Sequence, residues 1–468
     1  MKTILDFLIE NKKRSPISFH KPGHKGRSDI FEKAGYGDFY TYMLKEDITE
    51  IPGADALFNP HGLIKSSMEY YADLYGVKHT ELLVNGSSAG VIAAILATVP
   101  RGGKLILGRN SHHSAFSALR LGDIQPVYMK SEYMKEFGLL GNVPASEIRA
   151  ACQANPDAAA VLVTSPNYYG MMSELGRIAE IVHQYGMILI VDQASGSHLK
   201  FFDAINGTRN AAEDNGADIV INSMHKTLLG ITGTGILNVC SDRVKLDVLA
   251  DKLRMVQTTS PSYLMLGSLD VNEKILRRYG GDMVNTWMDD LRYVYSRLTA
   301  IRGVKVLTNE HLDPTRISIS LADVGVSAEQ LERELRQNGV CAEQVHGKYV
   351  LLMTGAGNTR EDYIAVVNVV RNLVNHYGMG KQPQVRELDN PDFTLKCVDV
   401  PNESESIPLY EADGRALYNP LITYPPGSPI ACPGEIMNLE VISYVAHALE
   451  RGEHVVGVDE EGYVVVGK

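Results

Sequence analysis

The stretch Ile219-Val220-Ile221-Asn222-Ser223-Met224-His225-Lys226-Thr227-Leu228 joins a β-branched apolar run to a polar cluster that contains one lysine. The apolar run predicts a buried strand. Lysines usually lie on solvated faces, so a lysine directly after such a strand is unusual. Loss of solvent would lower the pKa of the Lys226 amine and favour its action as a nucleophile.

A second strand with the same pattern lies upstream, where Met187-Ile188-Leu189-Ile190-Val191 is followed by Asp192. This carboxylate could cap a turn, but the carboxyl end of a central strand is also where doubly wound sheets bind ligands. Asp192 and Lys226 together match the needs of a pyridoxal 5'-phosphate (PLP) enzyme. The lysine forms a Schiff base with the cofactor, and the carboxylate pairs with the protonated pyridine nitrogen, which keeps the ring an electron sink. This predicts carbanion chemistry on an amino acid.

Two further strand ends carry polar loops. Residues 82–90 (Leu-Leu-Val-Asn-Gly-Ser-Ser-Ala-Gly) run from a strand into a helix start, where backbone N–H groups and hydroxyls suit a phosphate, although a simple helix cap is also consistent with them. Residues 108–114 contain His112 and His113. An imidazole there could stack on a pyridine ring, although histidine pairs in loops are also typical of surfaces and caps. We expect no metal site, because further ligands at close spacing are lacking.

Composition narrows the class of protein. The 468 residues are 44% hydrophobic and 22% charged, as in a soluble globular protein of two or three domains. The net charge of −11 disfavours nucleic-acid and anionic-membrane binding. Five cysteines without a Cys-x-x-Cys spacing predict reduced core residues rather than disulfides or zinc ligands. We expect a cytoplasmic protein, because there is neither an apolar run near ~20 residues nor a secretory signal.

The pattern of apolar residues predicts the organisation of the chain. Residues 1–15 resemble an amphipathic helix, and strands alternate with helices between about 64 and 300, which indicates a mostly parallel sheet covered on both faces. Strands at 304–307, 315–321 and 348–353 and helices at 328–337 and 360–377 predict a smaller α+β unit, followed by a linker at 378–391. A helix at 436–451 and a hairpin at 455–466 end the chain. The predicted units are 1–45 (N-terminal helix and active-site loop), 46–300 (PLP-binding large domain), 301–385 (small α+β domain) and 386–468 (C-terminal domain).

These motifs, in this order, resemble the Orn/Lys/Arg decarboxylase family of fold-type I PLP enzymes, and the resemblance covers nearly the whole chain. It rests on His20-Lys-Pro-Gly-His-Lys-Gly26, Asp47-Ile-Thr with Gly53, Asn85-Gly-Ser-Ser-Ala-Gly90, Asn110-Ser-His112, Val191-Asp-Gln-Ala194, Ser223-Met-His-Lys226-Thr-Leu, Thr259-Ser-Pro-Ser-Tyr263 and Tyr424-Pro-Pro-Gly with Pro433-Gly-Glu435. The resemblance implies an aspartate aminotransferase-like α/β fold, with smaller α+β domains after the large one. The chain resembles the short form of the family, without an N-terminal wing domain.

The resemblance also implies roles for individual residues. Lys226 would hold the cofactor, Asp192 would pair with its ring nitrogen, and His112 and Ala194 would lie on opposite faces of the ring. The phosphate would be held by Ser87, Ser88, Ala89, Ser223 and His225. The family forms dimers with active sites at the subunit interface, so a homodimer or larger homo-oligomer is expected. The chain departs from the family pattern at Gln193, Ser195 and 230–235, which lie near the expected substrate.

The leading hypothesis is α-decarboxylation of arginine, lysine or ornithine, with Lys226 or His225 returning a proton to Cα. The cationic end of such a substrate needs an acidic partner, for which Asp47, Glu50, Asp55 and Glu435 are candidates. One alternative is another PLP reaction, such as transamination, elimination or aldol cleavage, which Arg316 and Arg360 leave open as possible carboxylate ligands. A second is a non-catalytic PLP-binding protein. A Rossmann dehydrogenase is disfavoured because no Gly-x-Gly-x-x-Gly opens a helix after a strand.

Overall fold

The computed structural model describes residues 13–14, 16–41, 43, 47–134, 137, 139–377, 395–424, 428–450, 452 and 454–468. The helix predicted at 1–15 therefore lies almost entirely outside the described residues, as does the linker predicted at 378–391. None of the helices in the described ranges is both long enough and apolar enough to span a membrane.

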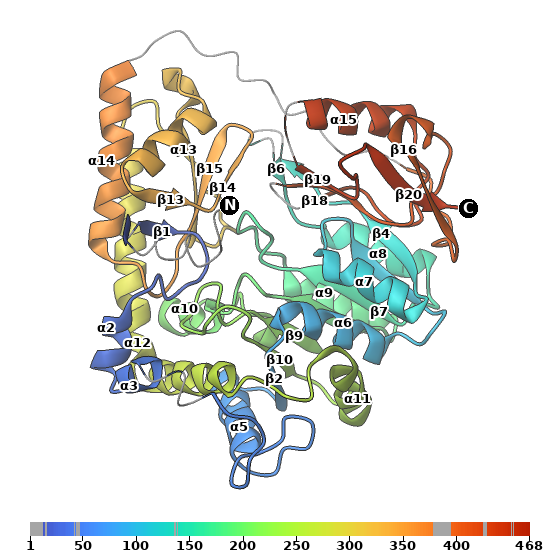
Figure 1. The fold of residues 1–468 in the computed structure, drawn as a ribbon, viewed down its shortest axis with the longest axis horizontal. Coiled ribbons are helices and arrows are strands. Elements are labelled where there is room, and N and C mark those ends of the chain that lie inside the picture. The colour runs from blue at the N-terminus through green and yellow to red at the C-terminus, as the bar shows by residue number, and fades with distance from the viewer. Residues whose placement is uncertain are drawn as a thin grey trace.

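A seven-stranded sheet forms the centre of the molecule (Figure 1). Its strand order is β2 (His79–Leu83), β10 (Gly235–Val239), β9 (Ile219–Asn222), β8 (Ile188–Asp192), β7 (Ala160–Thr164), β3 (Lys104–Gly108) and β4 (Gln125–Met129). β10 runs antiparallel to both of its neighbours, and the remaining pairs are parallel. The mostly parallel sheet predicted from the sequence is confirmed, because all seven strands fall where the apolar runs placed them.

Helices cover both faces of this sheet, so successive strand residues enter different cores. On one face, Ile190 and Ile221 pack with α6 (Gly86–Thr98), α7 (His113–Gly122) and α11 (Leu246–Val256). On the other face, Leu189 and Val220 pack with α8 (Ala145–Ala154) and α9 (Leu175–Gln184). Burial of both faces explains why these strands are apolar throughout rather than alternating. The remaining elements of this region are α5 (Leu63–Tyr75), α10 (Leu199–Asn206) and the short pair β5 (Tyr133–Met134) and β6 (Leu139–Leu140).

The 37-residue helix α12 (Tyr263–Thr299) joins the large sheet to a second layer, and the sequence patterns did not identify it. Leu266 and Leu276 in its first part pack in a cluster with α5. Val284 and Leu298 in its second part pack in the cluster of the smaller sheet. The helix therefore buries different sides along its length, and no single apolar stripe runs through it.

A four-stranded antiparallel sheet follows, in the order β11 (Lys305–Val306), β12 (Arg316–Ser320), β15 (Tyr349–Met353) and β14 (Gln344–His346). It packs with α13 (Ala328–Gln337) and α14 (Arg360–Tyr377). These two helices and the strands β11, β12 and β15 agree with the predicted ones, whereas β14 was not predicted. β1 (Ile17–Phe19) pairs in parallel with β13 (Val340–Ala342), so the N-terminal segment is anchored here. The short helices α2 (Ser28–Lys33) and α3 (Gly37–Thr41) come after β1.

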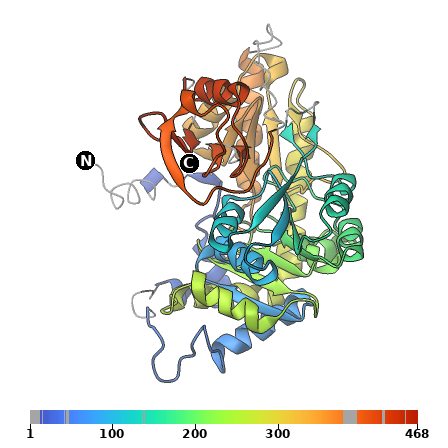
Figure 2. The same ribbon diagram turned by 90° about the vertical axis from the view of Figure 1, so that its right-hand side faces the viewer.

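The C-terminal part has its own apolar cluster around α15 (Leu439–Glu450) (Figure 2). The hairpin predicted at 455–466 is wrong as a strand pair. β19 (His454–Val456) pairs with β17 (Leu421–Tyr424), which also pairs with β18 (Ser428–Ala431), whereas β20 (Tyr463–Gly467) pairs with β16 (Ser404–Pro408). The turn between them makes one bridge, Val458 to Val464. The partners of both strands lie far away in the sequence, so a local pattern could not identify them. The domain boundaries stay predictions.

The cysteines agree only in part with the prediction of reduced core residues. All five are free. Cys152 and Cys432 are buried, Cys240 and Cys341 are intermediate, and Cys397 is exposed. The prediction of a core position is therefore wrong for Cys397, which follows the undescribed residues 378–394.

Candidate active site

Asp192 is the last residue of β8, and Lys226 lies in the turn after the neighbouring parallel strand β9, so both lie at the carboxyl edge of the seven-stranded sheet. Asp192 is 5% exposed and accepts a hydrogen bond from the Ala194 N–H at 3.1 Å. Ala194 is also buried, and its small side chain leaves room beside the strand end. This edge is where sheets of this kind bind ligands.

Lys226 is half-buried in the turn after β9, and its N–H donates to the Ser223 carbonyl at 3.3 Å. The pKa of the Lys226 amine is lowered to about 8, chiefly by desolvation and also by the cation of Lys21, while Asp192 opposes the shift. Near neutral pH, part of the amine is therefore unprotonated. An unprotonated amine is the nucleophile that a cofactor aldehyde requires.

His112 caps the N-terminus of α7, and its Nδ1 accepts the Ser114 N–H at 3.3 Å. The surrounding protein lowers the pKa of His112 to about 4 through desolvation, with Asp192 opposing and Lys226 adding to the decrease. The structure thus brings His112, Asp192 and Lys226 close enough to act on one another. A neutral, flat imidazole at this place is suited to stack on an aromatic ring.

The loop before α6 forms the candidate phosphate cradle. Gly86 has φ +73°, a left-handed conformation that glycine adopts readily. Ser87 and Ser88 lie in the first turn of α6, and the Ser223 hydroxyl donates to the Ser87 hydroxyl at 2.7 Å. The side chain of Ala89 is apolar and buried, so only its backbone N–H can donate to a phosphate. Backbone donors, hydroxyls and a positive helix end together fit a phosphate group.

His225 precedes Lys226, and its Nδ1 lies 2.9 Å from the Thr234 carbonyl, to which it donates. Nε2 is therefore the ring nitrogen left for other partners. Desolvation lowers the pKa of His225 to about 4, with the Thr234 bond opposing and Lys226 contributing. Near neutral pH the ring is uncharged.

The N-terminal loop, residues 20–26, packs on the turn of Lys226. Gly23 donates its N–H to the His225 carbonyl at 2.7 Å, and a Cβ at Gly23 would lie 2.5 Å from the Leu228 carbonyl oxygen. Lys21 pairs with the buried Glu343 at 2.9 Å. The loop therefore places the cation of Lys21 close enough to Lys226 to act on its amine.

A buried polar network that the sequence patterns did not identify lies behind Lys226. His198 is 3.2 Å from the Thr227 hydroxyl through Nδ1 and 3.1 Å from Asp313 through Nε2. Arg316 donates to the Ser195 carbonyl at 2.7 Å and lies 3.9 Å from Asp313. These side chains are fully buried. They link the small sheet to the turns after β8 and β9, and no local motif distinguishes them.

The acidic residues considered as partners for the cationic end of the substrate do not lie together beside Lys226. Asp55 accepts the backbone N–H groups of His61, Gly62 and Ala56, which hold its pKa at about 2 against desolvation. Glu435 pairs with Arg109. Asp47 and Glu50 are exposed at the start of the segment 47–62, which extends away from the sheet (Figure 2).

The sequence profile of the Orn/Lys/Arg decarboxylase major domain matches residues 3–320, and that of the family's C-terminal domain matches residues 393–463. The chain belongs to this family. Membership confirms the predicted family and class of enzyme, an amino acid decarboxylase.

Relatives and solved structures agree with this family. An arginine decarboxylase of Bacillus subtilis is 30% identical over 97% of this chain and 94% of its own length. A constitutive lysine decarboxylase of Escherichia coli is 21% identical over 98% of this chain and 78% of its own length. The lysine decarboxylase of Francisella novicida superposes with a TM-score of 0.76 at 17% identity, over 96% of this chain and 78% of that one. The predicted fold-type I architecture is confirmed.

Proposed function

We propose that this protein is a PLP-dependent decarboxylase of basic amino acids and that arginine is its preferred substrate. The observation that carries the proposal is the meeting of Lys226, Asp192 and His112 at one sheet edge in a member of a decarboxylase family. The named arginine decarboxylases, at 29–30% identity over nearly the whole chain, favour arginine over lysine.

The residues present fit PLP. Lys226 supplies a desolvated amine, and Asp192 supplies a buried carboxylate for a pyridine nitrogen. His112 and Ala194 would lie on the two faces of the ring. Ser87, Ser88, the N–H of Ala89, Ser223 and His225 would hold the phosphate. When bound, PLP would supply an electron sink for the pair that stays on Cα when CO₂ leaves.

Asp192 keeps this sink effective because a carboxylate stabilises a protonated ring nitrogen. Its burial strengthens the interaction, since little water screens it. The Ala194 N–H donates to one oxygen of the Asp192 carboxylate, which leaves the carboxylate with capacity to accept another bond.

Two groups can move the proton that replaces CO₂ at Cα. The Lys226 Nζ, with a pKa near 8, holds a proton for part of the time at neutral pH. The His225 Nε2 is the alternative, but a neutral ring that donates to Thr234 through Nδ1 carries no proton on Nε2. Since burial keeps His225 largely neutral, Lys226 is the better proton donor of the two.

The contacts of Arg316 and Arg360, the two possible carboxylate ligands named from the sequence, disfavour transamination. Arg316 is fully buried, and its two Nη atoms donate to Thr315 and Ser195. Arg360 pairs with Asp290 between α12 and α14 and lies over the Tyr293 ring. The Arg316 Nη atoms and the Arg360 guanidinium are therefore engaged within the protein, which leaves them less available to a substrate carboxylate.

The acidic partner of the substrate is proposed to come from a second copy of the chain. Asp47 and Glu50 are exposed on the outlying segment 47–62 and could reach the partner's site in a homodimer. Such a carboxylate would bind a guanidinium through two parallel hydrogen bonds, which favours arginine. The product would be a polyamine-type amine.

The decisive assay follows CO₂ release from arginine, lysine and ornithine with PLP supplied, alongside keto-acid formation. We expect CO₂ from arginine, no keto acid, and borohydride trapping of the cofactor on the peptide that contains Lys226. A protein that stays colourless with PLP, or that forms keto acid without CO₂, would refute the proposal. A cofactor band that changes with amino acid but gives no product would instead indicate a non-catalytic PLP-binding protein.

A further inference from the structure

The C-terminal part of the chain holds the loop that carries His112. Arg109 follows β3 and lies three residues before His112. Its Nη2 donates to Glu435 at 2.9 Å and to the Ile430 carbonyl at 2.8 Å. The two side chains are 11% and 4% exposed, so the ion pair is buried between β3 and the C-terminal part.

Hydrogen bonds to the backbone hold both residues of the Arg109–Glu435 ion pair in place. The Arg109 N–H donates to the Met129 carbonyl at the end of β4, at 3.1 Å. The Glu435 carboxylate accepts the Cys432 N–H at 2.8 Å, and Tyr128 on β4 donates to the Pro433 carbonyl at 2.8 Å. A shift of Glu435 would therefore move Arg109 and the short loop that leads to His112.

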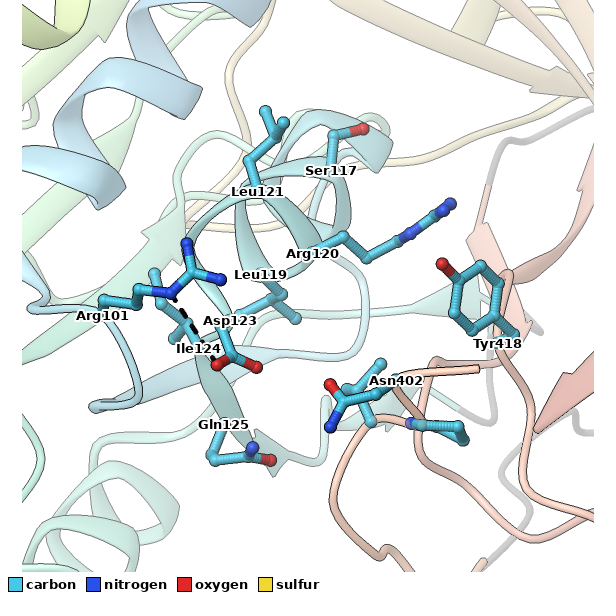
Figure 3. Close-up of a pocket in the computed structure, with 12 residues that line it drawn as sticks. Arg101, Ser117, Leu119, Arg120, Leu121, Asp123, Ile124, Gln125, Asn402 and Tyr418 are labelled. Carbon is cyan, nitrogen blue, oxygen red and sulfur yellow. Dashed lines mark ion pairs between the residues drawn. The ribbon is translucent and has the colours of Figure 1, made fainter. Parts of the chain in front are cut away.

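A second contact joins the C-terminal part to the far end of α7, the helix that His112 caps. Arg120 donates to Asn419 at 2.8 Å, and its guanidinium lies 4.2 Å from the centre of the Tyr418 ring. Figure 3 shows Arg120 pointing towards Tyr418 beside a cleft of about 470 Å³. This contact is solvent-exposed and so weaker than the buried pair at the other end.

We propose that Arg109 and Glu435 are positioning residues through which the C-terminal part sets the place of His112 against the cofactor. The inference rests on the proposed role of His112. It assigns Glu435 to an intramolecular contact rather than to the substrate. Because stacking depends on where the ring lies, a small displacement of the loop weakens cofactor binding and turnover.

The test compares two Glu→Gln changes in the C-terminal part. Glu435→Gln keeps the shape of the side chain but leaves the Arg109 cation buried without its counter-charge. Glu405→Gln is the matched control, because Glu405 pairs with Arg415 in a half-exposed position away from His112. We expect PLP affinity and turnover to fall about tenfold or more in Glu435→Gln, with a shifted cofactor absorbance, and to stay unchanged in the control.

A double variant separates positioning from a general loss of stability. Arg109→Gln with Glu435→Gln removes both buried charges, so resistance to urea should recover relative to Glu435→Gln alone. PLP affinity should remain low, because the ion pair that locates the loop is still missing. Recovery of both properties in the double variant would overturn the inference.

The outcome is distinguishable from failure of the proposed function. A wild-type protein that binds no PLP and releases no CO₂ refutes the proposed function. An active wild type whose Glu435→Gln variant matches Glu405→Gln in cofactor affinity and absorbance refutes the positioning role alone.

Discussion

The two sides of the candidate site differ in how the sequence encodes them. On the side of the large sheet, Asp192 ends β8 and Lys226 lies in the turn after β9, so each is placed by its own strand. On the opposite side, Lys21 and Glu343 are separated by 322 residues and meet only in the folded chain. The first side supplies the groups proposed to react, whereas the second changes their environment, since Lys21 and Glu343 both shift the pKa of Lys226. Changes on the first side should therefore abolish activity, and changes on the second should adjust it.

The largest effect is expected for Lys226→Ala. Without this amine the cofactor has no covalent attachment point, so CO₂ release should fall below about one thousandth of the wild-type rate. Borohydride should no longer fix the cofactor to the protein. Lys33→Ala is the control, because Lys33 is 79% exposed on α2. Retention of full activity in Lys226→Ala would show that Lys226 is not the reacting group on the side of the large sheet.

Asp192→Asn should have the next largest effect. An amide of the same shape cannot stabilise a protonated pyridine nitrogen by charge, so turnover should fall about a hundredfold or more. Some PLP should still bind, since Lys226 and the phosphate cradle are unchanged. The assay is CO₂ release together with cofactor content, with the exposed Asp157→Asn as control. Near-normal turnover in Asp192→Asn would contradict the assigned role.

The same contrast explains which parts could be predicted from sequence. Strands such as 219–222 and 235–239 coincide with predicted ones because burial of both faces makes them apolar throughout. Helix α12 and the pairing of β19 and β20 were not predicted, because their partners lie far away along the chain. In the site, groups that follow a strand were identified, whereas His198 and Asp313 lie in a network made by tertiary contacts alone.

Asp313→Asn should test the stability of that network. Asp313 is fully buried between His198 and Arg316. Loss of its charge should lower the free energy of unfolding by about 3 kcal/mol, because Arg316 is left without its counter-charge. Despite desolvation, His198 and Arg316 lower the pKa of Asp313 to about 2 from 3.8. Its folded-state pKa lies below the unfolded one, so this contribution is present above about pH 4 and is lost as the pH falls towards 2.

Urea unfolding at several pH values would measure this contribution. Between pH 5 and pH 2 the free energy of unfolding of the wild type should fall by about 2 kcal/mol more than that of Asp313→Asn, because only the wild type carries this carboxylate. Exposed Asp123→Asn is the control. Parallel pH curves for the wild type and Asp313→Asn would show that the buried network does not hold Asp313 ionised.

The smallest effect is expected for Lys21→Met, on the adjusting side of the site. Removal of this cation leaves Glu343 without its partner, and both changes favour the protonated amine of Lys226. The pKa of Lys226 should therefore rise, by less than about one unit. Because only the unprotonated amine captures the cofactor, the protein freed of PLP should recapture it more slowly at pH 7 but at the wild-type rate at pH 10.

The control combines Lys21→Met with Glu343→Gln, which removes one charge of each sign. It should shift the pH profile of cofactor capture less than Lys21→Met alone. Identical pH profiles of cofactor capture in the wild type and these variants would show that Lys21 and Glu343 do not act on Lys226 by charge.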